Sequence, residues 1–207
     1  MHPLYRGLIS ALCVFGISCA FGVTNQSGVT LGVNGGWANP DNKPSITNFS
    51  TANKNATVGA AVGYNYAFGQ HISTGVEANY TDFGKTNYNG NSSVGNASGS
   101  FKNSAIQVLM TGTYLMDNGF NTFLKVGAAH ESSDLSLSNS SSSSDVSTWL
   151  PAVAAGLGYD LIQNLNIYAE YERTIGSNWD DATTTKAPSS AASMNAFTMG
   201  VNYTLPM

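Results

Sequence analysis

The chain has few charged residues. Only 10% of its 207 residues are Asp, Glu, Lys or Arg, whereas soluble domains contain roughly 25%. Twelve acidic residues outnumber eight basic ones, which argues against nucleic acid as a partner. Ten Tyr, nine Phe and three Trp argue against disorder. Gly, Ser, Thr and Asn take the place of the missing charged residues. This composition suits a wall that faces lipid around a lumen lined with hydroxyls and amides.

Cysteine is confined to the first 20 residues, as Cys13 and Cys19. This stretch has the pattern of a secretory signal peptide: Arg6 supplies the positive region, an apolar run follows, and small residues precede a cleavage point after Ala20. We therefore predict a signal peptide over residues 1–20 and one mature domain over residues 21–207. The exported protein would then contain no thiol and no disulfide.

A lipoprotein is the alternative interpretation of this segment, with Cys19 as the acylated residue. Gly16 stands three residues before Cys19, where the lipobox usually has Leu. Loss of Arg6 leaves seven basic and twelve acidic residues, a net charge of −5 for the mature chain.

Long hydrophobic runs are also absent from the mature chain. The longest candidate, residues 150–159, contains Pro151, Gly156 and Gly158 and is followed by Asp160. A membrane-spanning helix needs about 20 apolar residues. If the protein is in a membrane, we expect it to cross as strands.

The last stretch, residues 194–205, shows a clear strand alternation. Phe197, Met199, Val201, Tyr203 and Leu205 fall on one face, and small or polar residues fall on the other. A strand covering a soluble core would present charge to water on its second face. This pattern instead predicts a strand with lipid on one side and a small polar interior on the other.

Seven earlier stretches alternate in the same way and are predicted as strands over residues 29–37, 57–68, 71–83, 105–116, 120–130, 148–161 and 165–175. Short turns and long polar segments connect the eight strands in strict alternation. The predicted turns are 69–70, 117–119 and 162–164, and the predicted loops are 39–55, 84–100, 131–147 and 176–190. We predict an all-β fold, an eight-stranded antiparallel up-and-down transmembrane β-barrel.

A set of aromatic residues is predicted to form an interfacial girdle near the short turns: Tyr64, Tyr66, Phe68, Tyr114, Phe120, Tyr159 and Tyr203. Soluble eight-stranded barrels of the lipocalin or avidin kind are the alternative. They place apolar residues inside, the reverse of the pattern here.

The final strand resembles the terminal assembly signal of bacterial outer-membrane barrels, with Thr198, Gly200, Tyr203 and Leu205 at the matching positions. It departs from that pattern at its end, where Pro206 and Met207 follow. With the strand pattern, this makes the chain similar to the small outer-membrane barrels of the OmpA, OmpX and opacity-protein type. The resemblance implies a bacterial outer-membrane location, insertion by the barrel-assembly machinery, three periplasmic turns, four extracellular loops and no cofactor; a monomer is expected.

Four charged residues are predicted to point into the lumen. Glu77, Lys125 and Glu170 each lie about six residues from a short turn, so they should meet near mid-height, with Glu172 one layer further out. Because an eight-stranded barrel has room only for side chains, the simpler interpretation is a salt-bridge cluster that plugs the lumen. A gated ion path is the alternative.

His130, Ser132 and Asp145 form a candidate catalytic group at the outer rim. They resemble the lipid-facing Ser/His/acid group of the lipid A deacylases, which are also eight-stranded barrels. Asp145 stands where that family has Glu, and a solvated rim histidine is the simpler interpretation. No metal site is predicted, because His71 and His130 lie at opposite ends of the barrel.

The scaffold carries no other catalytic motif, so function is expected to reside in the loops, where residues such as Phe49, Tyr88 and Trp179 are candidate contact points. The leading hypothesis is a non-enzymatic surface protein that stabilises the envelope and presents loops for adhesion or host contact. A narrow passive pore is the second hypothesis, and a lipid A-modifying hydrolase is the third.

Overall fold

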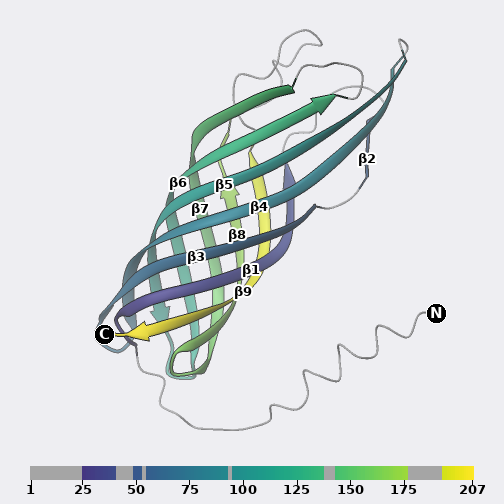
Figure 1. Ribbon diagram of the computed structural model, residues 1–207. Coiled ribbons are helices and arrows are strands. Elements are labelled where there is room, and N and C mark those ends of the chain that lie inside the picture. The colour runs from purple at the N-terminus through teal and green to yellow at the C-terminus, as the bar shows by residue number, and fades with distance from the viewer. Residues whose placement is uncertain (1–24, 41–48, 53–54, 93–94, 138–142, 177–192) are drawn as a thin grey trace, which may run out of the picture.

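The computed structural model describes residues 25–40, 49–52, 55–92, 95–137, 143–176 and 193–207. The predicted signal peptide and Trp179 lie outside these residues. The described part consists of strands joined by turns (Figure 1). Among the described residues there is no helix of the length and apolarity needed to cross a membrane.

Nine strands form one sheet, and every pairing in it is antiparallel. In chain order they are β1 (Gly28–Pro40), β2 (Phe49–Ala52), β3 (Asn55–Phe68), β4 (Ile72–Ser92), β5 (Gly95–Leu115), β6 (Phe120–Leu137), β7 (Ser143–Ile162), β8 (Leu165–Thr174) and β9 (Met194–Pro206). The sheet closes where β1 pairs with both β3 and β9, and where β4 pairs with both β3 and β5. The predicted eight-stranded up-and-down barrel is confirmed, with β2 as an addition outside the ring.

The register of the pairs sets the stagger of the barrel. Starting at Asp82, the paired residues lead through β3, β1, β9, β8, β7, β6 and β5 and return to β4 at Ile72, ten residues closer to the short turn. A stagger of this size tilts the strands of an eight-stranded barrel by roughly 40°. Residues far apart in sequence therefore reach the same height in the lumen.

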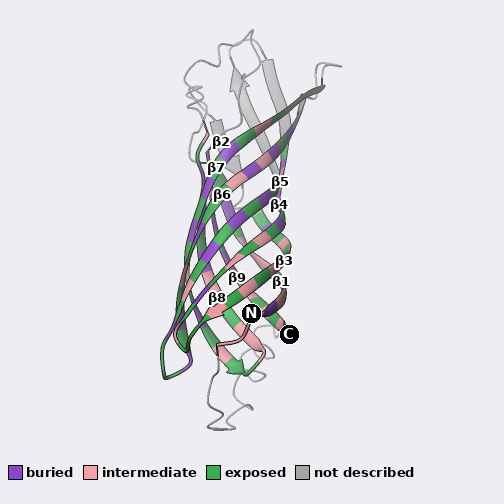
Figure 2. Ribbon diagram, turned by 90° about the vertical axis from the view of Figure 1, so that its left-hand side faces the viewer, coloured by how far each residue is buried: buried purple, intermediate pink, exposed green. Residues whose placement is uncertain are grey.

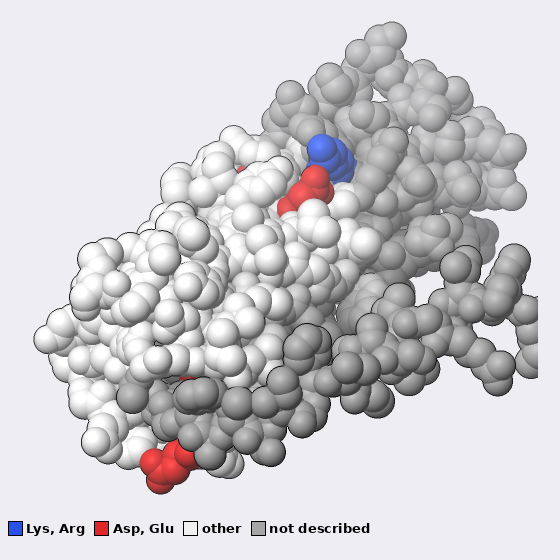
Figure 3. All heavy atoms as spheres, turned by 60° about the horizontal axis from the view of Figure 1, so that its bottom comes forward, with Lys and Arg blue, Asp and Glu red and all other residues white. Residues whose placement is uncertain are grey.

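The two faces of the wall differ as the alternation predicts. Large apolar side chains are exposed on the outside of every strand of the ring, among them Val33, Val62, Val76, Met110, Leu124, Leu157 and Met199. In the part of the ring whose burial is described, buried or intermediate inward residues alternate with more exposed outward residues (Figure 2). The face in Figure 3 shows few charged side chains. The seven predicted girdle residues are all exposed. Four of them lie near strand ends at the short turns: Phe68 and Tyr114 both flank Ile72, and Phe120 pairs with Tyr159. The soluble-barrel alternative does not fit this sidedness.

Glycine allows two of the predicted tight turns. Gly69 and Gly119 have positive φ angles of 74° and 84°, a backbone conformation that side chains with a Cβ disfavour. A third glycine, Gly84 (φ 76°), lies at a bulge in β4, where its N–H donates to Asp82 Oδ1 at 2.8 Å. Beyond this bulge β4 continues to Ser92.

Three of the predicted loops contain more strand than expected. Residues 84–100 were predicted as loop, but β4 runs to Ser92 and β5 begins at Gly95. Within residues 131–147, β6 extends to Leu137 and β7 begins at Ser143, and β2 lies within residues 39–55. The prediction was wrong here because an antiparallel ladder is built from backbone hydrogen bonds, which can continue through Asn-, Gly- and Ser-rich sequence where alternation gives no signal.

Candidate functional site

Three charged side chains meet in the lumen near mid-height. Lys125 Nζ on β6 lies 2.9 Å and 3.1 Å from the two carboxylate oxygens of Glu77 on β4, and 2.8 Å from Glu170 Oε2 on β8. The three side chains are almost fully enclosed, with exposed fractions of 7%, 12% and 2%. We call Glu77, Lys125 and Glu170 the mid-lumen cluster.

Small residues on β7 make room for this cluster. Lys125 pairs with Ala154, and Glu170 pairs with Gly156, so the strand between them sends little volume into the lumen. The two long side chains can therefore meet across it.

Two aromatic rings complete the surroundings of the ammonium group. Lys125 Nζ lies 5.3 Å from the ring centroid of Phe123 and 5.7 Å from that of Tyr168, and the two rings contact each other edge to face. Gly200 on β9 allows this arrangement, because a Cβ there would lie 2.5 Å from Tyr168 Cζ. Two carboxylates and two ring faces around one cation hold it by charge and by cation–π attraction.

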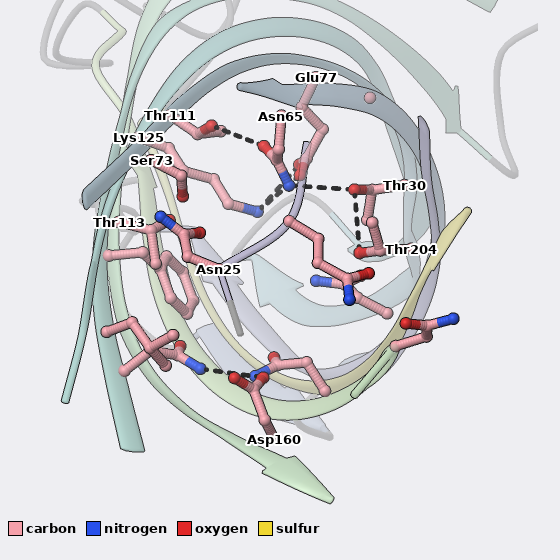
Figure 4. Close-up of a pocket in the computed structure, with 18 of the residues that line it drawn as sticks. Asn25, Thr30, Asn65, Ser73, Glu77, Thr111, Thr113, Lys125, Asp160 and Thr204 are labelled. Carbon is pink, nitrogen blue, oxygen red and sulfur yellow. Dashed lines mark hydrogen bonds and ion pairs between the residues drawn. The ribbon is translucent and has the colours of Figure 1, made fainter. Parts of the chain in front are cut away.

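A polar cavity of about 130 Å³ lies between the mid-lumen cluster and the rim with the short turns (Figure 4). Amide and hydroxyl side chains line it: Asn65 Nδ2 donates to Thr30 Oγ1 at 3.0 Å, and Asp160 Oδ1 accepts from Asn166 at 2.6 Å. Asn25 reaches over the rim and donates to the carbonyl of Ile72 at 2.7 Å. This half of the lumen is hydrophilic and ends at the cluster.

The other half of the lumen holds two further carboxylates. Glu172 accepts a hydrogen bond from Gln107 Nε2, and Gln107 Oε1 in turn accepts from Asn79 Nδ2 at 3.4 Å. Glu131 accepts from Thr174 Oγ1 at 2.5 Å and from Asn103 Nδ2 at 3.4 Å. Around them is an apolar core of inward residues: Ala38, Phe83, Ala105, Leu109, Ala129, Ala152, Met194 and Ala196.

Glu131 is a lumen residue that the sequence analysis missed. It was assigned to a loop, but it lies on β6 with no exposed surface. Its inward position follows from the spacing of two that already places Asn121, Lys125 and Ala129 inside. The signal was therefore in the sequence, and the serine-rich stretch after it hid the continuation of the strand.

Of the candidate catalytic group, the structure describes the side chains of His130 and Ser132, and the side chain of Asp145 lies outside the described ones. The His130 ring packs edge to face on Trp149 at 5.0 Å, and Ser132 is exposed on the same outer side. The pairing of β6 with β7 sets His130 beside Trp149, Ser132 beside Ser147 and Asp134 beside Asp145. The backbone of Asp145 is thus level with Asp134, and no hydrogen bond joins His130 to Ser132 in the described contacts.

The residues of the terminal signal lie on β9 with alternating direction. Thr198 is buried inside, Gly200 faces Tyr168, and Tyr203 and Leu205 are exposed on the outer wall. The candidate contact residues Phe49 and Tyr88 lie on the paired strands β2 and β4. In the described part of the chain, no group of three His, Cys, Asp or Glu side chains is placed to hold a metal ion.

Comparison with known proteins agrees with this geometry. The family model of the OmpA-like transmembrane domain matches residues 25–205, whereas comparison with curated proteins gave no match. The solved structures to which the chain is similar include the following three. The outer membrane protein OprG of Pseudomonas aeruginosa has 13% identity and a TM-score of 0.58, over 90% of this chain and 100% of that one. Neisserial surface protein A has 13% identity and a TM-score of 0.53, over 87% of this chain and 99% of that one. Ail, the attachment invasion locus protein of Yersinia pestis, has 20% identity and a TM-score of 0.51, over 88% of this chain and 99% of that one. At these identities the likeness shows the fold alone.

Proposed function

The chain belongs to the OmpA-like transmembrane domain family, and we propose that it is a non-enzymatic surface protein that stabilises the envelope and presents extracellular hairpins for adhesion or host contact. Its location is the bacterial outer membrane. The barrel is the anchor in this proposal, and recognition belongs to the segments above it.

One observation carries the proposal: two paired strands are far longer than a membrane requires. Both β4 and β5 have 21 residues, and a tilted strand spans a bilayer with about 9–11. The excess lies entirely on the rim opposite the short turns, since β4 and β5 stay paired out to Ser92 and Gly95. A paired hairpin that projects this far is a stiff platform for contacts.

The filled lumen supports the same conclusion. The mid-lumen cluster crosses the barrel at mid-height, and Phe83 and Met194 are buried above it. A barrel built for transport would leave this volume to water.

The proposal is tested by shortening a hairpin while keeping the barrel. Deletion of residues 87–100 brings Thr86 next to Phe101, which are already paired. A matched control deletes residues 137–142 from the β6–β7 hairpin, next to the Ser136–Ser143 pair. We expect a strain with the first deletion to lose host-cell binding as a full deletion strain does, with equal surface amounts of both shortened proteins. Unchanged host-cell binding and detergent resistance in the full deletion strain would contradict the proposal.

A narrow passive pore is the second candidate function. The cavity of about 130 Å³ favours it, because it brings water-accessible space from the short-turn rim up to Lys125. Planar-bilayer recordings of the pure protein test this function. A large steady current would refute the plugged lumen, whereas its absence would leave the surface function in place.

The third candidate function is that of a lipid A hydrolase built on His130, Ser132 and Asp145. Mass spectrometry of lipid A after incubation with the pure protein decides it, with Ser132→Ala as the control. Loss of an acyl chain with the wild-type protein alone would overturn the non-enzymatic assignment.

Three further proposals concern export and assembly. Residues 1–20 act as a signal peptide, and the N-terminal mass of the exported protein tests this and reports any lipid on Cys19. Thr198, Gly200, Tyr203 and Leu205 serve as the signal read by the barrel-assembly machinery. The protein is a monomer, which light scattering in detergent measures.

A further inference from the structure

Glu172 is a buried carboxylate without a cationic side chain beside it among the described residues. Its exposed fraction is 4%, and its neighbours on the adjacent strands are Ala154 and Ala196. Lys125 is already paired with Glu77 and Glu170. Lys102 and Arg173, the other Lys and Arg residues whose side chains the structure describes, occupy outward positions of their strands. A carboxylate in such surroundings is costly unless its charge is compensated.

Three other oxygen atoms in the same part of the lumen have no hydrogen-bond partner in the described structure. They are Asn79 Oδ1, Thr81 Oγ1 and Thr198 Oγ1, and all three residues are at most 3% exposed. Buried polar atoms in native proteins are nearly always satisfied by protein, water or ligand. These three oxygens are therefore available to a further ligand in this part of the lumen.

The contacts and strand pairings place these three residues in the same part of the lumen as Glu172. Asn79 is joined to Glu172 through Gln107 by two hydrogen bonds. Thr198 pairs with Glu170, and is thus the diagonal neighbour of Glu172 across β8 and β9. Thr81 lies two residues further along β4 than Asn79 and points the same way.

We propose that Glu172, Asn79, Thr81 and Thr198 bind one monovalent alkali cation, sodium or potassium, in the lumen above the mid-lumen cluster. All the donors are oxygens, the ligands that hard cations take. Only one of them carries a formal charge, which matches a single positive charge. Water alone would satisfy the unpaired oxygens but not the charge, whereas a proton on Glu172 would remove the charge but leave the other oxygens unpaired.

Crystallography of the full-length protein in detergent, with thallium(I) in place of potassium, tests the site directly. We expect an anomalous peak within bonding distance of Glu172, Asn79 and Thr198. Ordered water at this position without an anomalous peak would overturn the proposal, because water would then satisfy the unpaired oxygens and a proton would neutralise Glu172. This result would leave the surface function untouched.

A solution measurement keeps the proposal testable if a variant crystallises poorly. At constant ionic strength, with N-methylglucamine chloride as the replaced salt, the urea midpoint of unfolding should rise by roughly 0.5–1 M for each tenfold increase in sodium or potassium above the dissociation constant. Glu172→Gln and Thr198→Val should each abolish this rise. Asp160→Asn, which removes a lumen carboxylate near the short turns, should retain it. An equal rise in all four proteins would overturn the proposal.

Discussion

Replacement of Lys125 by methionine removes the only cation of the mid-lumen cluster and keeps the length of the side chain. Two carboxylates then remain, each of which had an ion pair at 2.8–3.1 Å. The side chains of Glu77 and Glu170 are 12% and 2% exposed, so most of their surface is shielded from water. Removing one partner of a buried ion pair destabilises proteins by about 3–5 kcal/mol, and we expect a loss of this size for Lys125→Met.

A second lysine offers a matched control. Lys102 lies 3.9 Å from Asp82, but its side chain is 56% exposed and points out of the barrel. Exposed ion pairs contribute about 0–1 kcal/mol, so Lys102→Met should change the free energy of unfolding by no more than that. Both variants replace Lys by Met, so the difference between their losses in the free energy of unfolding reports the effect of burying the ion pair.

Urea unfolding in detergent micelles or lipid vesicles measures both losses, with tryptophan fluorescence as the signal. The triple variant Glu77→Gln, Lys125→Met, Glu170→Gln removes the unpaired charges as well, and it should recover at least half of the stability lost in Lys125→Met. Equal losses of less than about 1 kcal/mol for the two lysine variants would refute the inference that the mid-lumen cluster is a tightly enclosed ion pair.

Three further predictions concern the wall and its closure. Gly200→Val should lower the folded fraction on refolding into detergent, because its Cβ would lie 2.5 Å from Tyr168 Cζ and 2.6 Å from the carbonyl oxygen of Val33; adding Tyr168→Ala removes the first contact and should restore part of the folded fraction, and no recovery would argue against the contact with Tyr168 as a cause. Val62→Arg, outward and six residues from the turn after Phe68, should destabilise the barrel in lipid by about 2–4 kcal/mol, whereas Asn39→Arg at the rim should have little effect; equal effects would contradict a lipid-facing wall. On a detergent gel, the unboiled protein should migrate apart from the boiled protein, and identical mobility would contradict a closed barrel.

The positions of the eight strands and the direction of their side chains could be predicted from the sequence. The reason is that alternation is local: whether Val201 or Asn202 faces lipid depends only on its neighbours along the same strand. The meeting of Lys125 with Glu77 and Glu170 was accessible in the same way, since each lies a similar number of residues from a short turn. Composition and the terminal pattern of β9 indicated the membrane.

The tertiary structure decided what depends on pairing between strands. The ten-residue stagger of the barrel sets which lumen residues share a height, and it links Gln107 on β5 to Glu172 on β8. Pairing also carried β4, β5, β6 and β7 into segments whose composition predicted loop, which kept Glu131 within a strand and placed the backbone of Asp145 level with Asp134. A backbone ladder bonds without regard to side-chain type, so no pattern within one strand could have shown where the ladder ends.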